Sequence, residues 1–167
     1  MNFSEAWLQQ LGDARGAAAR TDSLHLLGES YEHFLRGYGM DAAKIISDGR
    51  IKADAAVGQE ITVAPLPFYS LCEHHLLPFF GTVSITYAPR EWILGLGKFP
   101  RLVEALSARL TLQETLTAAI ADTLFENLNP HSCRLTVEAR HLCLEMRGAQ
   151  TISTAMITIA TRPASKK

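Results

Sequence analysis

One stretch organises this chain, YSLCEHHLLPFFG at residues 69–81. It places a thiol, a carboxylate and two imidazoles at four consecutive positions, Cys72, Glu73, His74 and His75, inside an otherwise apolar segment. Zinc takes thiolate sulfur and imidazole nitrogen as ligands, and a two-residue gap lets a tight turn bring Cys72 and His75 to one ion. The stretch therefore indicates part of a metal site.

A second pair, His141 and Cys143, offers another imidazole and another thiol. If Cys143 joins Cys72 and His75, the metal has three protein ligands and one open position, which is the arrangement of catalytic zinc. His74 and His141 then have free ring nitrogens beside the metal, as acid–base chemistry near neutral pH requires. The alternative interpretation is a buried thiol near a hydrogen-bonded histidine, the more common meaning of an isolated Cys-x-x-His pair.

Composition narrows the class of protein. The chain has 167 residues, a formal net charge of −1 and 47% hydrophobic residues, so it is not disordered and has no basic field for nucleic acid. Its apolar runs are shorter than the roughly 20 residues of a membrane helix, and charged residues within the first twenty positions argue against a signal peptide. Three cysteines are an odd count that argues against a disulfide framework, so we expect a cytoplasmic protein in which Cys133 is a small buried residue.

The hydrophobic pattern predicts an N-terminal helical region, 1–50, and a catalytic region, 51–167, within one domain. Helices are expected at residues 4–20, from Asp22 or Ser23 to about Tyr38, after Asp41, and from 98 to 128 with a break near Thr111. Strands are expected at residues 59–64, 82–87, 92–96, 134–146 and 151–160. Prolines 65 and 67 are expected to end the first strand, and residues 82–96 to form a hairpin. This order predicts an α+β fold with an antiparallel sheet backed by helices.

Residues 134–146 carry the second half of the metal site. If the strand is regular, His141, Cys143 and Arg147 lie on one face, because strand side chains alternate. The buried face then changes midway, which predicts that the strand passes from the core into a cleft or a subunit interface.

These motifs resemble those of GTP cyclohydrolase I, and the resemblance spans about residues 59–159. The stretch at 70–79 is similar to the zinc motif of that family. The segments 95–98 (GLGK), 113–114 (QE) and 141–148 (HLCLEMRG) follow in the family's order and approximate spacing. The resemblance implies a tunnel fold, in which protomers join their sheets into a ring that stacks into a decamer.

The resemblance also implies roles for individual residues. Its zinc ligands correspond to Cys72, His75 and Cys143, and its catalytic histidines to His74 and His141. Its guanine anchor corresponds to Glu114 supported by Gln113, and its triphosphate contacts to Gly97, Lys98, Arg101 and Arg147. The implied reaction is zinc-dependent hydrolysis of the guanine imidazole ring of GTP, giving formate and 7,8-dihydroneopterin triphosphate.

Four positions depart from the family pattern and thin the phosphate-binding part, while the zinc and base-recognition parts are intact. Gly97 stands where the family usually has serine, and Thr115 where it has arginine. His25 and Gly28 stand where an arginine and a lysine are expected. Three hypotheses follow: a GTP cyclohydrolase I, a diverged enzyme acting on another purine nucleotide, or a non-catalytic subunit that binds a purine or pterin. The two histidines, which a binding module would not need, argue against the third.

Overall fold

The computed structural model describes residues 23–163, except for the side chains of residues 23–25. The chain divides into two compact units at the boundary between Leu35 and Arg36. Within the first unit, helix α2 (Ser23–Phe34) is described. The predicted helix at residues 4–20 lies outside the described part of the chain.

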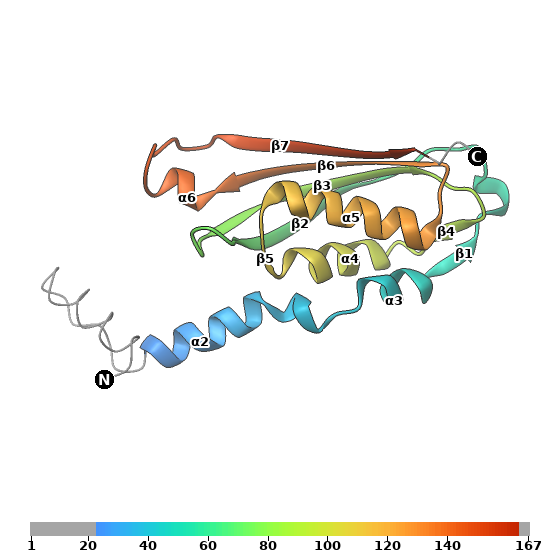
Figure 1. The fold of residues 1–167 in the computed structure, drawn as a ribbon. Coiled ribbons are helices and arrows are strands. Elements are labelled where there is room, and N and C mark those ends of the chain that lie inside the picture. The colour runs from blue at the N-terminus through green and yellow to red at the C-terminus, as the bar shows by residue number, and fades with distance from the viewer. Residues whose placement is uncertain (1–22, 164–167) are drawn as a thin grey trace, which may run out of the picture. The chain divides into compact units, whose positions relative to one another are not determined.

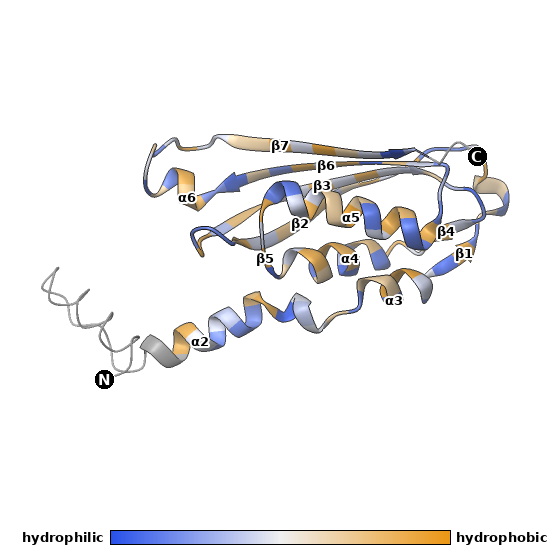
Figure 2. Ribbon diagram, in the orientation of Figure 1, coloured by the Kyte–Doolittle hydropathy of each residue, from blue (hydrophilic) through white to orange (hydrophobic). Residues whose placement is uncertain are grey.

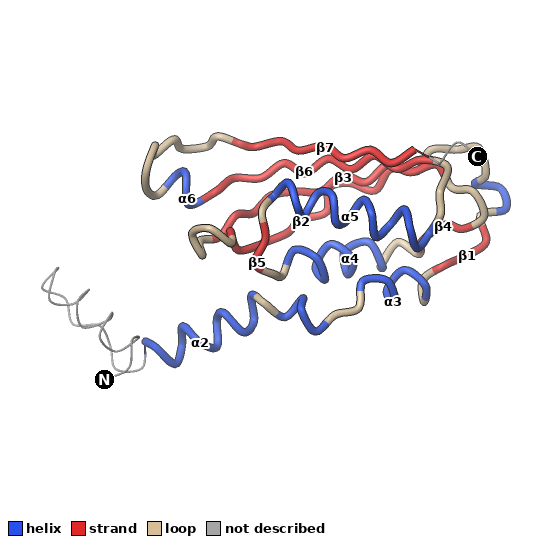
Figure 3. Tube along the Cα trace, in the orientation of Figure 1, coloured by secondary structure: helices blue, strands red, loops and turns tan. Residues whose placement is uncertain are grey.

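The second unit contains a five-stranded sheet whose order is β5-β2-β3-β6-β7 (Figures 1 and 3). The pairs β2–β3, β3–β6 and β6–β7 are antiparallel, and β5 joins β2 in parallel. Helices α4 and α5 cover one face of this sheet. The bounds are β2 (Ile61–Cys72), β3 (Pro78–Ala88), α4 (Lys98–Ser107), β5 (Leu110–Thr111), α5 (Gln113–Leu128), β6 (Ser132–His141) and β7 (Ala155–Pro163). The predicted α+β fold, with helices on one face of the sheet, is confirmed. The predicted break between two helices near Thr111 is also confirmed.

Alternation along the strands builds the core between the sheet and the helices. Val83 and Ile85 of β3 and Leu135 and Val137 of β6 are fully buried on the face that meets α4 and α5. Figure 2 shows hydrophobic residues interspersed with hydrophilic ones along both helices, as expected for helices with one buried side. Cys133 is 1% exposed, which confirms the prediction of a small buried residue.

A smaller two-stranded sheet and several short helices accompany the main sheet. They are η1 (Arg36–Gly39), α3 (Ala42–Ser47), β1 (Arg50–Lys52), η2 (Asp54–Ala56) and β4 (Trp92–Leu94). Asp41 caps α3 as predicted, since its carboxylate accepts from the amide of Lys44. Strand β4 pairs with β1, so the predicted hairpin of residues 82–96 is wrong. The physical reason is that β2 and β6 already occupy both edges of β3.

Two further predictions about strands are wrong. The prolines do not end β2, which continues to Cys72 with a shift in register between Val63 and Leu66, where the cis peptide of Pro65 lies. The strand predicted for residues 134–146 ends at His141 and is followed by a helical turn, α6 (Leu142–Glu145). The sequence pattern of residues 134–146, in which the buried face changes midway, therefore reflects the change from strand to helix.

Candidate active site

The stretch 72–77 forms the tight turn between β2 and β3. The amide of Cys72 donates to the carbonyl of Leu77 at 2.9 Å, and the amides of His75 and Leu76 donate back to the carbonyl of Cys72. Leu76 completes the turn with a left-handed φ of 55°. This local geometry brings Cys72 Sγ within 3.6 Å of His75 Nδ1.

Cys143 reaches the same place from α6. The ligand atoms of Cys72, His75 and Cys143 all lie within 4.8 Å of one another. Burial, and after it the neighbouring thiol of Cys72, raises the pKa of Cys143. A divalent cation would offset both effects by favouring thiolates. Two sulfurs and one imidazole nitrogen are the donors that zinc prefers, so this group could hold a metal ion with a position left open.

An ion pair holds α6 against the end of β6. The Nε and Nη2 groups of Arg140 donate to the two carboxylate oxygens of Glu145, each at 2.7 Å. The side chain of Glu145 is only 8% exposed, and the hydrogen bonds from Arg140 lower its pKa. Because Cys143 lies between these two residues in the chain, the pair restrains the turn that presents the Cys143 thiol.

The two histidines outside the Cys–His–Cys group differ in their surroundings. His141 ends β6, and its Nε2 lies 2.8 Å from Oε1 of Gln113. Burial lowers the pKa of His141, and the carboxylate of Glu114 opposes that effect. His74 is exposed in the β2–β3 turn, with its ring edge-on to His75 at 6.1 Å between centroids.

Gln113 and Glu114 begin α5 but face different environments. Glu114 is exposed, whereas Gln113 is 1% exposed and uses its side-chain amide inside the protein. Besides the contact with His141, Gln113 Nε2 lies 2.9–3.1 Å from three acceptors, the carbonyl oxygens of Val137 and Met156 and the hydroxyl of Thr158. Sequence reasoning missed Thr158, because its contact depends on the pairing of β7 with β6.

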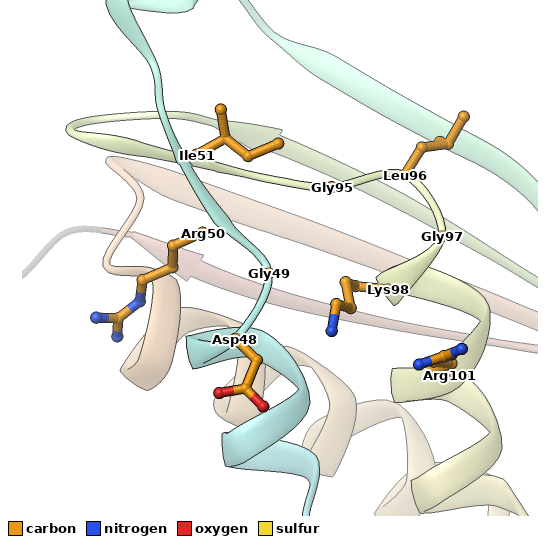
Figure 4. Close-up of a pocket in the computed structure, with 9 residues that line it drawn as sticks. All are labelled: Asp48, Gly49, Arg50, Ile51, Gly95, Leu96, Gly97, Lys98 and Arg101. Carbon is orange, nitrogen blue, oxygen red and sulfur yellow. The ribbon is translucent and has the colours of Figure 1, made fainter.

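Lys98 and Arg101 lie on a different part of the unit. They line a pocket of about 440 Å³ formed by residues 48–51, residues 95–98 and Arg101 (Figure 4). Among the described residues, neither of these two cations forms a salt bridge. Arg50 lines the same pocket, but its guanidinium donates to the carbonyl of Asn127 and extends away from Lys98 in Figure 4.

This pocket is far from the Cys–His–Cys group of the same chain. Phe99 follows Lys98 and packs beside Tyr87, which pairs with Ile61 at the start of β2. Cys72 is at the other end of that 12-residue strand and pairs with Thr111, which lies beyond the C-terminal end of α4, whereas Lys98 begins α4. One chain therefore does not bring Lys98 and Arg101 to the group.

The remaining predicted residues are placed as follows. Arg147 is exposed, two residues beyond α6, and so belongs to the Cys143 end of the unit. Gly97 is exposed, and a Cβ added there would meet no atom within 4 Å. Thr115 is exposed on the first turn of α5. Gly28 is exposed on α2 in the other unit, and the side chain of His25 lies outside the described part.

Comparison with known proteins agrees with the motifs. A family model described as GTP cyclohydrolase I matches residues 3–167. The chain belongs to the GTP cyclohydrolase I family. GTP cyclohydrolase 1 of Wolinella succinogenes is 38% identical over 157 residues, covering 94% of this chain and 83% of the relative. GTP cyclohydrolase 1 of Campylobacter jejuni is 41% identical over 134 residues, covering 80% of this chain and 70% of the relative.

The resemblance to GTP cyclohydrolase I found in the motifs is thus confirmed along nearly the whole chain. Among solved structures, archaeosine synthase QueF-Like in the apo form matches with a TM-score of 0.48 and 19% identity, over 65% of this chain and 94% of that one. No helix within residues 23–163 is long and apolar enough to span a membrane.

Proposed function

We propose that this protein is a zinc-dependent GTP cyclohydrolase I that opens the guanine imidazole ring of GTP and releases formate and 7,8-dihydroneopterin triphosphate. The observation that carries the proposal is the convergence of Cys72, His75 and Cys143 within 4.8 Å in a chain of this family. All three cysteines of the chain are free thiols, which suits a reducing cytoplasm.

Metal binding and proton transfer are assigned to different residues of the site. Cys72, His75 and Cys143 would hold the zinc. When bound there, zinc supplies Lewis-acid activation of water for attack on the C8 carbon of guanine. His141, held at the end of β6, protonates the ring nitrogen as the imidazole opens, and the exposed His74 transfers protons in later steps.

Recognition of the nucleotide uses two kinds of group. The carboxylate of Glu114 accepts hydrogen bonds from the N–H groups of guanine, for which it is exposed beside His141. Lys98, Arg101 and Arg147 bind the triphosphate through fixed positive charge, and Gly97 directly precedes Lys98.

The separation of these groups supports a homo-oligomeric ring, a decamer as the family implies. Because Lys98 begins α4 and Cys72 pairs with Thr111 beyond the opposite end of that helix, a neighbouring chain would supply Lys98 and Arg101 to each site. Strand β7 offers a nine-residue edge for joining sheets, with Ile157 and Ile159 exposed on it.

The direct test is to incubate purified, zinc-replete protein with GTP, oxidise the products and detect a fluorescent pterin together with one formate per GTP consumed. Pterin and formate in equal amounts would support the proposal. Absence of both from protein that holds one zinc per chain would refute it.

A second candidate is a diverged enzyme acting on another purine nucleotide. It is favoured by two departures from the family pattern, Gly97, which offers no side chain to a phosphate, and Thr115, which follows Glu114. Product analysis with GTP, GDP, GMP and the corresponding adenine nucleotides distinguishes the two candidates, because only the second predicts ring opening with little or no use of GTP. If no purine nucleotide reacts, the non-catalytic binding subunit becomes the remaining hypothesis.

A further inference from the structure

The orientation of the buried Gln113 amide can be assigned from its partners. The carbonyl oxygens of Val137 and Met156 can only accept hydrogen bonds, and they lie 3.1 and 2.9 Å from Gln113 Nε2. Turning the amide over would place its oxygen against both carbonyl oxygens. Its Oε1 must therefore face His141, and since Oε1 can only accept, His141 Nε2 must carry the hydrogen in their 2.8 Å contact.

A closed ring of hydrogen bonds among Gln113, Thr158 and Thr117 also holds the side-chain amide of Gln113. Thr117 Oγ1 donates to the Gln113 carbonyl at 2.7 Å, so its single hydrogen is used there. In the 2.6 Å contact between the two hydroxyls, Thr158 must then be the donor. Thr158 Oγ1 in turn accepts from Gln113 Nε2 at 3.1 Å, and since Nε2 has two hydrogens for three acceptors, one hydrogen is shared between two of them. Every donor direction in this ring follows from the partners, and Gln113 and Thr117 are both at least 98% buried.

We propose that Gln113, held by Thr117 and Thr158, is a positioning residue that fixes the hydrogen of His141 on Nε2 and leaves Nδ1 as the ring nitrogen that exchanges protons. Among the described residues, His141 makes no other side-chain hydrogen bond, so Nδ1 remains available. In the proposed reaction, the imidazolium form of His141 gives its Nδ1 proton to the lone pair of the purine ring nitrogen. The imidazole is left neutral, with its Nε2 hydrogen still donated to Gln113.

The first test reads the hydrogen directly and needs no turnover. Zinc-replete protein labelled with ¹⁵N in histidine should show a downfield N–H proton, protected from solvent exchange, that correlates with Nε2 of His141. His141→Gln assigns the signal by removing it. In Gln113→Leu the signal should be lost while the zinc content stays at the wild-type level. A protected hydrogen on Nδ1 in place of Nε2 would overturn the proposal.

The second test separates positioning from mere stability. Thr158→Val removes one hydroxyl from the ring, and kcat should fall by about three- to tenfold with little change in KM, as expected for one hydrogen bond. Thr158→Ser keeps the hydroxyl and should restore the rate. Thr123→Val is a matched control on α5, because Thr123 Oγ1 also donates to the carbonyl four residues back but lies outside the ring. Equal kcat in Thr158→Val and wild type would contradict the proposal.

The inference depends on the proposed function only for the identity of the reaction. Protein that leaves GTP unchanged but shows the protected Nε2 hydrogen would refute the proposed function and support the assignment of the hydrogen. An active enzyme with the protected hydrogen on Nδ1 would support the proposed function and refute the assignment of the hydrogen to Nε2. If Gln113→Leu does not fold, the proposal is still tested by the rates of Thr158→Val and Thr158→Ser and by the spectrum of the wild-type protein.

Discussion

Phe79 and His141 lie face to face, with parallel ring planes and centroids 4.8 Å apart. They are cross-strand partners of β3 and β6. Phe79 is fully buried and is supported edge-on by Phe68 at 5.8 Å. Since Phe79 sets the plane of the imidazole and Gln113 engages its Nε2, His141 is held from two directions before any substrate binds. Preorganisation of this kind reduces the cost of ordering a proton-transfer group during the reaction.

Zinc content should follow the Cys–His–Cys group. We expect wild-type protein to hold about one zinc per chain and Cys143→Ala to lose most of it, because two protein ligands remain in place of three. Elemental analysis of metal-replete protein measures this. Cys133→Ala is the control, since Cys133 is buried on β6 away from the group and should leave the zinc content unchanged. Full zinc retention in Cys143→Ala would show that the ligand assignment is wrong.

Loss of the Arg140–Glu145 ion pair should weaken zinc binding without removing a ligand. In Glu145→Gln the two-point contact that holds α6 is lost, so Cys143 becomes less well oriented, and we expect about a tenfold loss of zinc affinity. Competition with a chelator measures the affinity. Glu91→Gln is the control, because it breaks an exposed pair with Lys52 that is not connected to α6. Equal affinities in the two variants would exclude a role for the pair in presenting the thiol.

The two remaining histidines should matter for turnover and not for metal content. We expect His141→Ala and His74→Ala each to keep zinc and to lower kcat by about a hundredfold or more, the usual loss when a general acid or base is removed. Steady-state rates and zinc analysis on the same preparations test this. His33→Ala, on α2, serves as a control for loss of an exposed imidazole. Near-normal rates in both active-site variants would refute the proton-transfer roles.

Affinity for the phosphates should depend on Lys98 and Arg101. We expect Lys98→Ala to raise KM for GTP by about tenfold or more, because a charge-assisted hydrogen bond is lost, with a smaller effect on GMP. The wild-type preference for GTP over GDP, GMP and guanosine should be modest, because Gly97 offers no hydroxyl donor. The measurement is kcat/KM for the four compounds. Arg50→Ala is the control, because Arg50 lines the same pocket but donates to Asn127. An unchanged GTP preference in Lys98→Ala would remove it from the phosphate site.

The parts of the site that could be predicted from sequence are those set by local geometry. Cys72 and His75 are three positions apart, so one turn decides whether their side chains meet. The helix break near Thr111 and the cap at Asp41 are also local, since they follow from propensity and side-chain chemistry within a few residues. The distant Cys143 is indicated by its residue type and by resemblance, although it lies on a helical turn and not on the predicted strand.

The parts that could not be predicted depend on pairing between distant strands. Thr158 reaches Gln113 only because β7 pairs with β6 in a register that places Thr158 opposite Val137. The pairing of β4 with β1 follows from the occupied edges of β3, which no local pattern reveals. A one-residue slip in either ladder would move these side chains to the other face, so the contacts are properties of the assembled sheet.

The distance between Lys98 and the Cys–His–Cys group has a consequence for mixtures of variants. Under the proposed ring, a chain without Lys98 binds GTP weakly and a chain without Cys143 loses its zinc, so each is impaired alone for a different reason. In a mixed ring, an intact Lys98 from one chain can face an intact Cys143 from its neighbour, and that site regains activity. The other site formed by the two chains then lacks both Lys98 and Cys143 and stays inactive. Complementation and dominance between two damaged copies of this gene would therefore be determined by which chains are adjacent in the ring.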